Sequence, residues 1–346
     1  MRRLRTSDFD FELPAERIAH EPARPRDSAR LLRIGPALSD HIVRDLPGLL
    51  RAGDVLVAND TRVIPAQLSA HRGAARIGIT LDRPLPDGDW SALARNARKL
   101  KPGDVLDIDG DTTMQAQVIT APADGQVVLR FSLEGDAFAD ALRRAGALAL
   151  PPYIDRPQGP TAQDAQDYQT VFAQHEGAVA APTAALHFTP DLLAELTGAG
   201  ILRETITLHV GAGTFLPMRT ENVHEHRMHA ERGEISAGAA SRLNAIRAQG
   251  GRIVAVGTTV LRLLESAADE GGIHPFHGET DIFIVPGHRF HSADLLMTNF
   301  HLPKSTLFML VCAFAGEARM RAAYAHAIAT GYRFFSYGDS SLLDRA

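Results

Sequence analysis

The chain has 346 residues, which is long enough for two domains of ordinary size. Hydrophobic residues make up 45% of it and charged residues 22%, a composition that excludes a disordered chain. The formal net charge of −5 excludes a surface that is basic throughout, and the single cysteine, Cys312, excludes an internal disulfide and suits a reducing compartment.

Neither the N-terminal segment nor the longest apolar run is typical of an export signal or a membrane span. Residues 1–13 contain basic residues but lack the apolar core of a secretory signal. The longest apolar run, residues 307–315, is too short to span a bilayer and is typical of a buried segment. We therefore expect a cytoplasmic protein without a membrane partner.

The first half of the chain is rich in strand signals. Between residues 54 and 131, Gly, Pro and Asp turn signals separate short β-rich runs with no helical pattern between them. These runs are DVLVAND, TRVIPAQLSA, ARIGITL, WSALA, GDVLDI, MQAQVIT and QVVLRF. The pattern predicts a small β-structure such as a barrel.

Beyond about residue 151, predicted strands and helices alternate. Thr189 followed by Pro190 is typical of a helix start, and this helix should end near residues 198–200. There follow a strand in ILRETITLHV, a helix over about residues 237–249, a strand in RIVAVG, a helix in TTVLRLLESAA, strands in DIFIVPG and LLMTNF, and a helix from about Ser305. The alternation predicts an α/β layer.

The simplest arrangement is an α/β fold in which one domain interrupts the other. A discontinuous α/β main domain would use residues 1–64 and 153–346, and an inserted β-barrel-like domain would use residues 65–152. A plain tandem of two domains is the alternative.

Common enzyme signatures are missing, and short polar segments interrupt the predicted strands instead. There is no HExxH or GxSxG motif, and Leu216 occupies the third glycine position of a dinucleotide loop. The polar segments follow strands of the α/β layer, where the carboxyl ends of parallel strands bind ligands. They contain Thr183 and His187; His209, Gly211 and Gly213; Thr258 and Thr259; and Asn299, His301, Lys304 and Ser305.

Histidines are the main candidates for proton transfer, because their pKa lies near neutrality. His224, His226 and His229 lie within six residues of one another. This trio has three interpretations. The histidines could transfer protons or contact a ligand, they could bind a metal, or they could be surface residues without a function. For His187 and His301, the alternative to a functional role is a hydrogen-bonded histidine in the core.

A local basic cluster offers a site for nucleic acid despite the acidic net charge. Arg95, Arg98, Lys99 and Lys101 lie within seven residues. Such a cluster can contact phosphates, and the alternative is a solvated surface that happens to be basic.

Long segments of the chain resemble one enzyme family over residues 7–339. These segments are DFDFELPAERIAHEPARPRDSARLL, NDTRVIPAQL, LPPYI, GAVAAPTAALHFT, TLHVGAGTFLP, EHRMHAE, VAVGTTVLRLLES, TDIFI, TNFHLPKSTLFMLVCAFAG and YRFFSYGD. In this order they are similar to the S-adenosylmethionine:tRNA ribosyltransferase-isomerases of queuosine biosynthesis. The chain departs from the family at Ala185, Val260 and Gly78, where a glycine, a serine and a glutamate are usual.

The resemblance implies an α/β domain with an inserted β-barrel, and a defined reaction. The ribosyl unit of S-adenosylmethionine would be transferred to 7-aminomethyl-7-deazaguanine at the wobble position of tRNA. Epoxyqueuosine-tRNA would form, while adenine and methionine leave. S-adenosylmethionine is then a consumed substrate, and we expect no cofactor, no metal and a monomer. A metal-dependent hydrolase built on the histidine trio and a non-enzymatic RNA-binding module are the rival hypotheses.

The reaction requires a base, an acid, a clamp for the methionine carboxylate and a group that recognises the deazaguanine edge. We predict His226 and His229 as acid or base, with His187 and His301 next, and Arg262 or Lys304 as the clamp. Asp60 or Asp281 would accept hydrogen bonds from the base edge. Further candidates for substrate contact are Thr61, Arg62, Thr183, His209, Gly211, Gly213, Thr258, Thr259, Asn299 and Ser305, and for tRNA contact Arg95, Arg98, Lys99 and Lys101.

Overall fold

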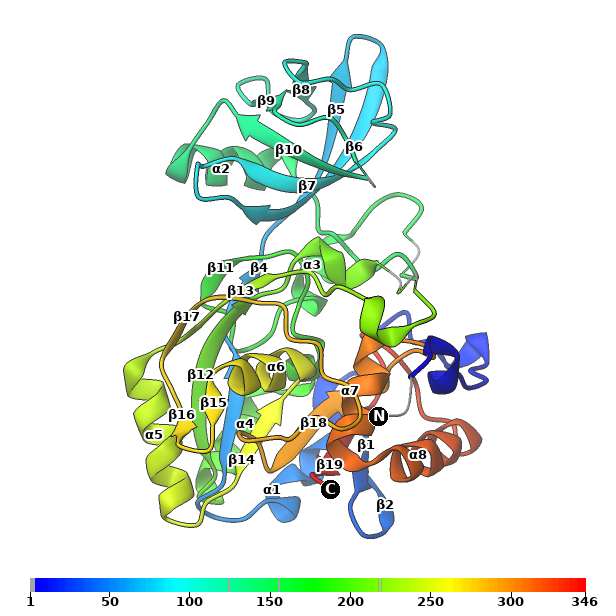
Figure 1. The fold of residues 1–346 in the computed structure, drawn as a ribbon, viewed down its shortest axis with the longest axis vertical. Coiled ribbons are helices and arrows are strands. Elements are labelled where there is room, and N and C mark those ends of the chain that lie inside the picture. The colour runs from blue at the N-terminus through cyan, green and yellow to red at the C-terminus, as the bar shows by residue number, and fades with distance from the viewer. Residues whose placement is uncertain (1–3, 124, 155, 217, 219) are drawn as a thin grey trace.

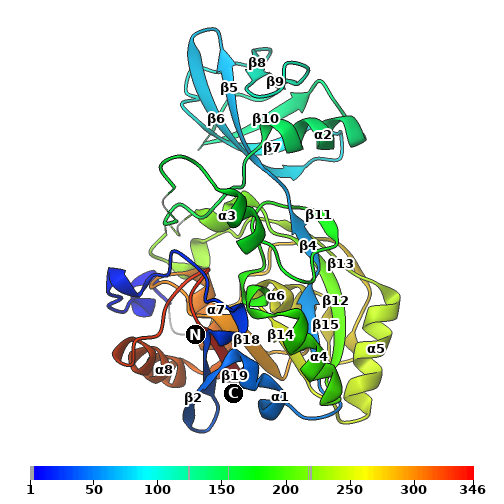
Figure 2. The same cartoon turned by 180° about the vertical axis from the view of Figure 1, so that it is seen from behind.

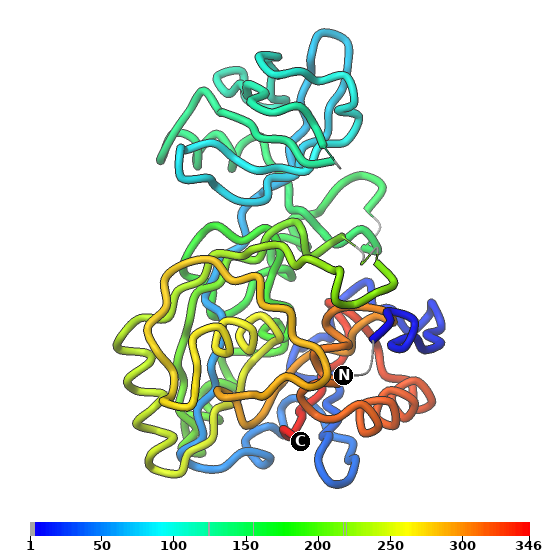
Figure 3. Tube along the Cα trace, viewed as in Figure 1, coloured from blue at the N-terminus to red at the C-terminus, as the bar shows by residue number. Residues whose placement is uncertain are grey.

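The structure is a computed structural model that describes residues 4–123, 125–154, 156–216, 218 and 220–346. A large part with a mixed sheet and a smaller β-barrel lie one above the other (Figure 1). The chain enters the barrel along β4 (Thr61–Val63) and returns after α2 (Gly135–Ala145), so the trace crosses between the two parts twice (Figure 3). This arrangement confirms the predicted fold class, an α/β fold with an inserted barrel. The exact boundaries at residues 64 and 153 stay a prediction.

Within the part of the chain that the structure describes, a nine-stranded sheet forms the centre of the large part. The middle strands run parallel to one another, and antiparallel pairs occur towards both edges. In spatial order the strands are β17 (Phe276–Thr280), β13 (Glu231–Ile235), β12 (Leu202–His209), β3 (Val55–Asn59), β14 (Ile253–Val256), β18 (Leu295–Asn299), β19 (Ser340–Asp344), β1 (Arg30–Ile34) and β2 (Leu38–Ile42).

Two helices begin at capping residues that the sequence predicts. The Thr189 hydroxyl accepts the Leu192 N–H at 3.2 Å at the start of α4 (Pro190–Gly198), and the Ser305 hydroxyl accepts the Phe308 N–H at 3.1 Å at the start of α7 (Thr306–Ala315). Both predicted helix starts are therefore confirmed. The other α-helices of the large part are α1 (Leu46–Leu49), α3 (Ala162–Asp167), α5 (Ala237–Ala248), α6 (Thr258–Ser266) and α8 (Glu317–Ala329).

Helices cover both faces of the middle strands, which explains why these strands are apolar at successive positions. Every residue of β3, β14 and β18 is buried. Alternate residues point to opposite faces, so Val55 and Val57 pack with α5, α6 and α7, whereas Leu56 packs with α1 and α4. Accordingly, α6 lies in front of the sheet in Figure 1 and α4 in Figure 2.

The inserted part is a closed barrel with the strand order β10-β7-β6-β5-β8-β9. Its strands are β5 (Gln67–Arg72), β6 (Ala75–Pro84), β7 (Trp90–Arg95), β8 (Val105–Ile108), β9 (Gln115–Val118) and β10 (Gln126–Phe131). Helix α2, which the sequence analysis did not predict, packs the Phe138 ring against Phe131 and Trp90 at centroid distances of 4.9 and 5.6 Å. Its signal was present, because Phe138, Ala141 and Leu142 share one helical face.

Two predicted strands differ in the structure. The run TRVIPAQLSA divides into β4 and β5 on either side of Pro65, which lacks a backbone donor. The predicted strand in DIFIVPG is wrong, because the strand is β17 and ends at Thr280, immediately before this run. No helix of the described residues is long and apolar enough to cross a membrane. Cys312 is buried in α7, and burial raises its pKa to about 12, as expected for an inert thiol.

Candidate active site

The carboxyl ends of the parallel strands meet at one edge of the main sheet, the edge that faces the barrel. The pairs β12–β3, β3–β14 and β14–β18 are all parallel. Several residues that the sequence predicts for substrate contact therefore lie along one edge: Asp60 and Thr61 after β3, His209 at the end of β12, Thr258 after β14 and Asn299 at the end of β18. Their roles stay predictions.

At the β14 and β18 half of this edge, the histidines are buried and hydrogen-bonded. His187 Nε2 lies 3.2 Å from Asn299 Oδ1, and His301 Nε2 lies 3.1 Å from Thr298 Oγ1. Both histidines are 6% exposed, and this burial lowers the pKa of His187 to about 4 and that of His301 to about 3. They are therefore neutral at pH 7, in agreement with the alternative of hydrogen-bonded core histidines.

At the β3 and β12 half, a buried asparagine holds the end of β3 in place. The Asn59 amide donates to the Leu208 carbonyl at 2.8 Å, and its oxygen accepts the N–H groups of Leu208 at 3.0 Å and Thr61 at 3.2 Å. Asp60 is also buried, and one of its carboxylate oxygens accepts the Thr207 hydroxyl at 2.7 Å. The main chain around Thr61 is thus fixed relative to β12.

Thr61 lies between two groups that its hydroxyl can contact. Its Oγ1 is 3.0 Å from Nδ1 of His209 and 3.3 Å from the main-chain oxygen of His175. Gly177, which has a φ of +141°, packs against the His209 ring, and a Cβ there would lie 2.8 Å from Nδ1. Only a glycine permits this close approach, so the local backbone and Thr61 together define where the ring lies.

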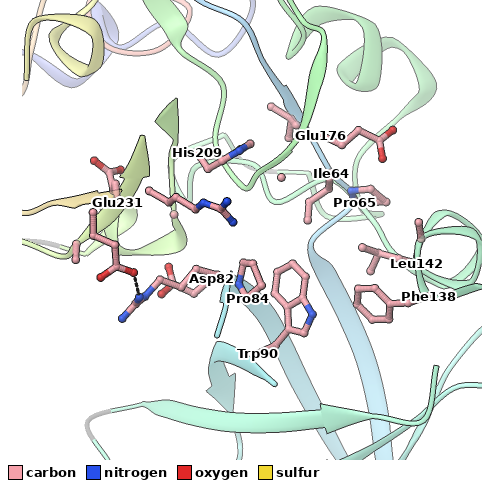
Figure 4. A pocket seen from close by; sticks show the side chains of 18 of the residues that line it. Ile64, Pro65, Asp82, Pro84, Trp90, Phe138, Leu142, Glu176, His209 and Glu231 are labelled. Atoms are coloured by element: carbon pink, nitrogen blue, oxygen red, sulfur yellow. Dashed lines mark hydrogen bonds and ion pairs between the residues drawn. The ribbon is translucent and has the colours of Figure 1, made fainter. Parts of the chain in front are cut away.

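A cavity of about 400 Å³ lies between this half of the sheet edge and the barrel (Figure 4). The close-up shows His209 on the main-sheet side, and Pro84 and Trp90 opposite it on the barrel side. The lining residues are Val63, Ile64, Pro65, Asp82, Arg83, Pro84, Trp90, Phe138, Ala139, Leu142, Arg143, Glu176, Gly177, His209, Gly211, Ala230, Glu231, Arg232 and Glu279. Trp90, Phe138 and Leu142 make one wall apolar, whereas charged groups line other parts.

Glu231 is the most buried carboxylate of the lining, and Arg262 holds it from behind. Arg262 Nη1 lies 2.5 Å from Glu231 Oε2, and the two side chains are only 6% and 8% exposed. Arg262 Nε also donates to the Ile282 carbonyl at 3.2 Å. Arg262 does not line the cavity, so a role as carboxylate clamp would require this ion pair to separate.

Gly211 allows the barrel and the main sheet to approach closely. Asp82, on β6 of the barrel, accepts the Ala212 N–H at 2.8 Å. A Cβ on Gly211 would lie 2.6 Å from the same carboxylate oxygen. The predicted glycine therefore supports the junction that forms the cavity. Pro217, at the end of the same motif, lies outside the described residues.

The predicted acid–base pair, His226 and His229, does not line the cavity. His226 is half-buried against the Phe283 ring at a centroid distance of 5.3 Å, and burial followed by the neighbouring His229 lowers its pKa. His229 is exposed and packs on Gly213, where a Cβ would lie 2.5 Å from its ring. Over the described ranges, no group of three or more His, Cys, Asp or Glu side chains is placed to hold a metal ion.

Other predicted residues also lie outside the cavity lining. Lys304 pairs with Asp10 at 2.8 Å, and Arg62 donates to the Ala173 carbonyl at 2.8 Å. Ser305 is the cap of α7. The remaining members of this group are Thr183 in a short 3₁₀ helix (Thr183–His187), Thr258 and Thr259 in the first turn of α6, and the exposed Asp281.

The predicted tRNA contacts lie at the end of β7 and in the segment that follows it. Arg95, Arg98, Lys99 and Lys101 are all exposed and none lines the cavity. They are thus accessible to a phosphate backbone.

Most of the lining contributed by the barrel and β13 is not among the residues predicted from the sequence. Trp90, Phe138 and Asp82 come from the inserted part, and Glu231 and Arg232 begin β13. Trp90 is the only tryptophan of the chain, and Glu231 ends the EHRMHAE segment, so weak signals existed for these two. Nothing in the pattern of strands indicated which face of the barrel would meet the sheet.

A family model described as queuosine biosynthesis protein matches residues 6–343. The chain belongs to this family. It is 68% identical to the S-adenosylmethionine:tRNA ribosyltransferase-isomerase of Gluconacetobacter diazotrophicus over 98% of this chain and 96% of that protein. It is 64% identical to the enzyme of the same name from Gluconobacter oxydans over 98% of each.

A solved structure of the same family has a related fold. The crystal structure of S-adenosylmethionine tRNA ribosyltransferase from Thermotoga maritima is 35% identical to this chain, covering 97% of it and 99% of the solved chain, with a TM-score of 0.56. The family membership thus agrees with the resemblance seen in the sequence and with the observed fold.

Proposed function

We propose that this queuosine-family protein is an S-adenosylmethionine:tRNA ribosyltransferase-isomerase. It transfers the ribosyl unit of S-adenosylmethionine to 7-aminomethyl-7-deazaguanine at the tRNA wobble position and releases adenine and methionine. The product is epoxyqueuosine-tRNA. The enzyme acts as a cytoplasmic monomer without a cofactor, since S-adenosylmethionine is consumed. The named relatives, at 64–68% identity over nearly their whole length, support this assignment.

The cavity between the barrel and the sheet edge is the observation that supports this location for the reaction. Its volume of about 400 Å³ is in the range of small-molecule sites. Trp90 and Phe138 offer an apolar wall against which a planar heterocycle can stack. The cavity also opens at the carboxyl ends of parallel strands, where open α/β sheets bind ligands.

The charges around the cavity suit a zwitterionic substrate with a sulfonium centre. Glu231 and Asp82 supply negative charge for the sulfonium and for the aminomethyl group of the acceptor base. The exposed Arg232 can pair with the methionine carboxylate, a role that the buried Arg262 does not offer in the observed arrangement. These charges are neighbours of His209, because Arg232 is paired with it in the β12–β13 register.

The exposed basic cluster on the barrel gives the tRNA a place to bind. Arg95, Arg98, Lys99 and Lys101 would contact phosphates near the anticodon loop while the modified base enters the cavity. Phosphate contacts position the nucleic acid without reading its sequence, so recognition of the base remains with the cavity.

The products of the reaction test this function. Purified protein, S-adenosylmethionine and tRNA carrying 7-aminomethyl-7-deazaguanine should yield adenine and methionine in equal amounts with the modified tRNA. Liquid chromatography of the small products and mass spectrometry of the digested tRNA would measure this. S-adenosylhomocysteine as the main product would instead show a methyltransferase and contradict the proposal.

A further inference from the structure

Among the described residues that line the cavity, His209 is the only histidine. The other ionisable lining groups are carboxylates and arginines. His209 therefore stands apart as the lining group whose ordinary pKa suits proton transfer. Neither member of the pair favoured by the sequence, His226 and His229, has this position.

The hydrogen bonds around Thr61 indicate which nitrogen of His209 carries its proton. A hydroxyl has one proton, and the His175 carbonyl can only accept. When Thr61 donates to this carbonyl, its oxygen accepts from Nδ1–H of His209 and both contacts are satisfied. Neutral His209 is then protonated at Nδ1, and Nε2 retains its lone pair. No side chain in the described ranges hydrogen-bonds to Nε2.

We propose that His209 is the catalytic base of the ribosyl transfer and that Thr61 is the positioning residue that selects its tautomer. This inference rests on the proposed function and adds a named proton acceptor to it. Gly177 contributes because only its missing side chain leaves room for the imidazole ring. The three residues lie on β12, β4 and β11 (His175–Ala178), which meet beside the cavity.

The proton transfer balances without an external reactant. His209 Nε2 takes a proton from the ribose carbon beside the sulfonium: the C–H bond breaks, an N–H bond forms, and the electron pair stays on the carbon as an ylide. The carbanion pair then forms a C=C bond to the neighbouring ring carbon, whose bond to the ring oxygen breaks, and that bond's pair forms a C=O bond at the anomeric carbon. As this happens the glycosidic C–N bond breaks, its electron pair goes to adenine, and adenine takes the proton from the imidazolium. The imidazole is neutral again, and the sugar fragment retains the sulfonium charge.

The surroundings of His209 lower its pKa and so favour the neutral form that can accept a proton. Burial lowers its pKa first, and the neighbouring Arg232 and His175 lower it further. Asp60 and Glu234 act in the opposite direction but do not cancel this effect. The acidic limb of the turnover profile should therefore lie below 6.5, the ordinary histidine pKa, as Nε2 becomes protonated.

The decisive variant is His209→Asn, whose amide can still reach Thr61 but cannot accept the proton. Adenine release should slow by roughly 10²–10⁴-fold, while S-adenosylmethionine binding measured by equilibrium dialysis should change little. The matched control is His274→Asn, since His274 is exposed and pairs with Asp269 away from the cavity. It should keep wild-type turnover.

The Thr61 variants separate positioning from mere structural support. Thr61→Val should lower kcat by about fivefold to tenfold, as expected for the loss of one hydrogen bond, and Thr61→Ser should restore it. Because the imidazolium loses an acceptor for Nδ1–H, the acidic limb of the kcat profile should move to lower pH in Thr61→Val and return in Thr61→Ser. An unmoved limb would contradict the positioning role even if the variant were less stable.

The outcomes distinguish this inference from the proposed function. If the wild-type protein releases no adenine, the proposed function fails. If the wild type is active and His209→Asn is equally active, or if His229→Asn alone removes activity, the function survives and the assignment of His209 is overturned. Circular dichroism of each variant establishes that it is folded.

Discussion

The two halves of the sheet edge that faces the barrel carry the same kinds of residue in different surroundings. In the β14 and β18 half, His187 and His301 are hydrogen-bonded and buried, and the Asn299 amide donates to the carbonyls of Phe335 and Ser336. In the β3 and β12 half, His209 borders a cavity. A histidine near the end of a parallel strand is thus not sufficient for a reactive site. Whether a ligand can reach it depends on which part of the chain packs over that strand end.

The two halves differ because the barrel packs over only one of them. Asp82 contacts Ala212 beyond β12, and Trp90 and Phe138 form a wall at a distance from the sheet edge, so space remains. Over the other half, the C-terminal segment packs directly on Asn299, whose amide donates to the carbonyls of Phe335 and Ser336. Four experiments should show whether the two halves of the sheet edge and the barrel differ in the ways described.

The largest expected effect concerns the ion pair behind the cavity. Arg262→Met would leave Glu231 as a buried, unpaired carboxylate and should lower the free energy of unfolding by about 3–5 kcal/mol. Arg242→Met, which breaks the more exposed pair with Glu204, should cost about 0–1 kcal/mol. Urea unfolding of both variants measures this, and equal losses would contradict the importance of burial.

Protonation of the buried histidines in the β14 and β18 half should make the free energy of unfolding depend on pH. The pKa values of His187 and His301 in the folded protein, about 4 and about 3, lie below the usual 6.5, so the unfolded chain binds more protons as pH falls below 6.5. The free energy of unfolding should therefore fall by up to about 1.4 kcal/mol per pH unit for each histidine between pH 6.5 and 4. Urea unfolding at pH 7.5, 6 and 5 tests this, and His301→Gln should reduce the slope. A flat profile would show that these histidines are not buried as described.

The binding of tRNA to the basic cluster on the barrel should depend on salt concentration. Replacing Arg98, Lys99 and Lys101 by alanine should weaken tRNA binding and lower the slope of log affinity against log salt by roughly 0.7–0.9 for each lost phosphate contact. S-adenosylmethionine affinity should be unchanged, because these residues do not line the cavity. A control that removes the exposed Arg203, Arg242 and Arg289 changes the net charge equally. If both triple variants behave alike, the basic cluster is only a solvated surface.

The smallest expected effect is that of chelation. Exhaustive dialysis against EDTA should leave adenine release unchanged, since the proposed chemistry at His209 uses proton transfer alone. Metal analysis of the dialysed protein provides the control. Loss of activity that one added divalent metal restores would revive the metal hypothesis for the histidine trio.

Much of the local structure follows from the sequence, because its signals depend on near neighbours. Thr189 and Ser305 mark helix starts through capping hydrogen bonds that span three residues. The strand predicted in DIFIVPG is wrong because the apolar composition of this run is the same as that of a strand. Helix α2 was missed although its apolar face was visible in Phe138, Ala141 and Leu142.

The family, the α/β class with an inserted barrel, and the polar segments at the strand ends, including Asp60, Thr61, His209 and Gly211, can all be recognised from the amino-acid sequence. Which of these residues border a cavity is known only from the way the barrel packs on the main sheet. The choice of His209 over His226 and His229 depends on Trp90 and Asp82 approaching from the barrel, more than a hundred residues away along the chain. Such long-range packing leaves no periodic signal in the sequence, because it depends on how the surfaces of the barrel and the main sheet meet.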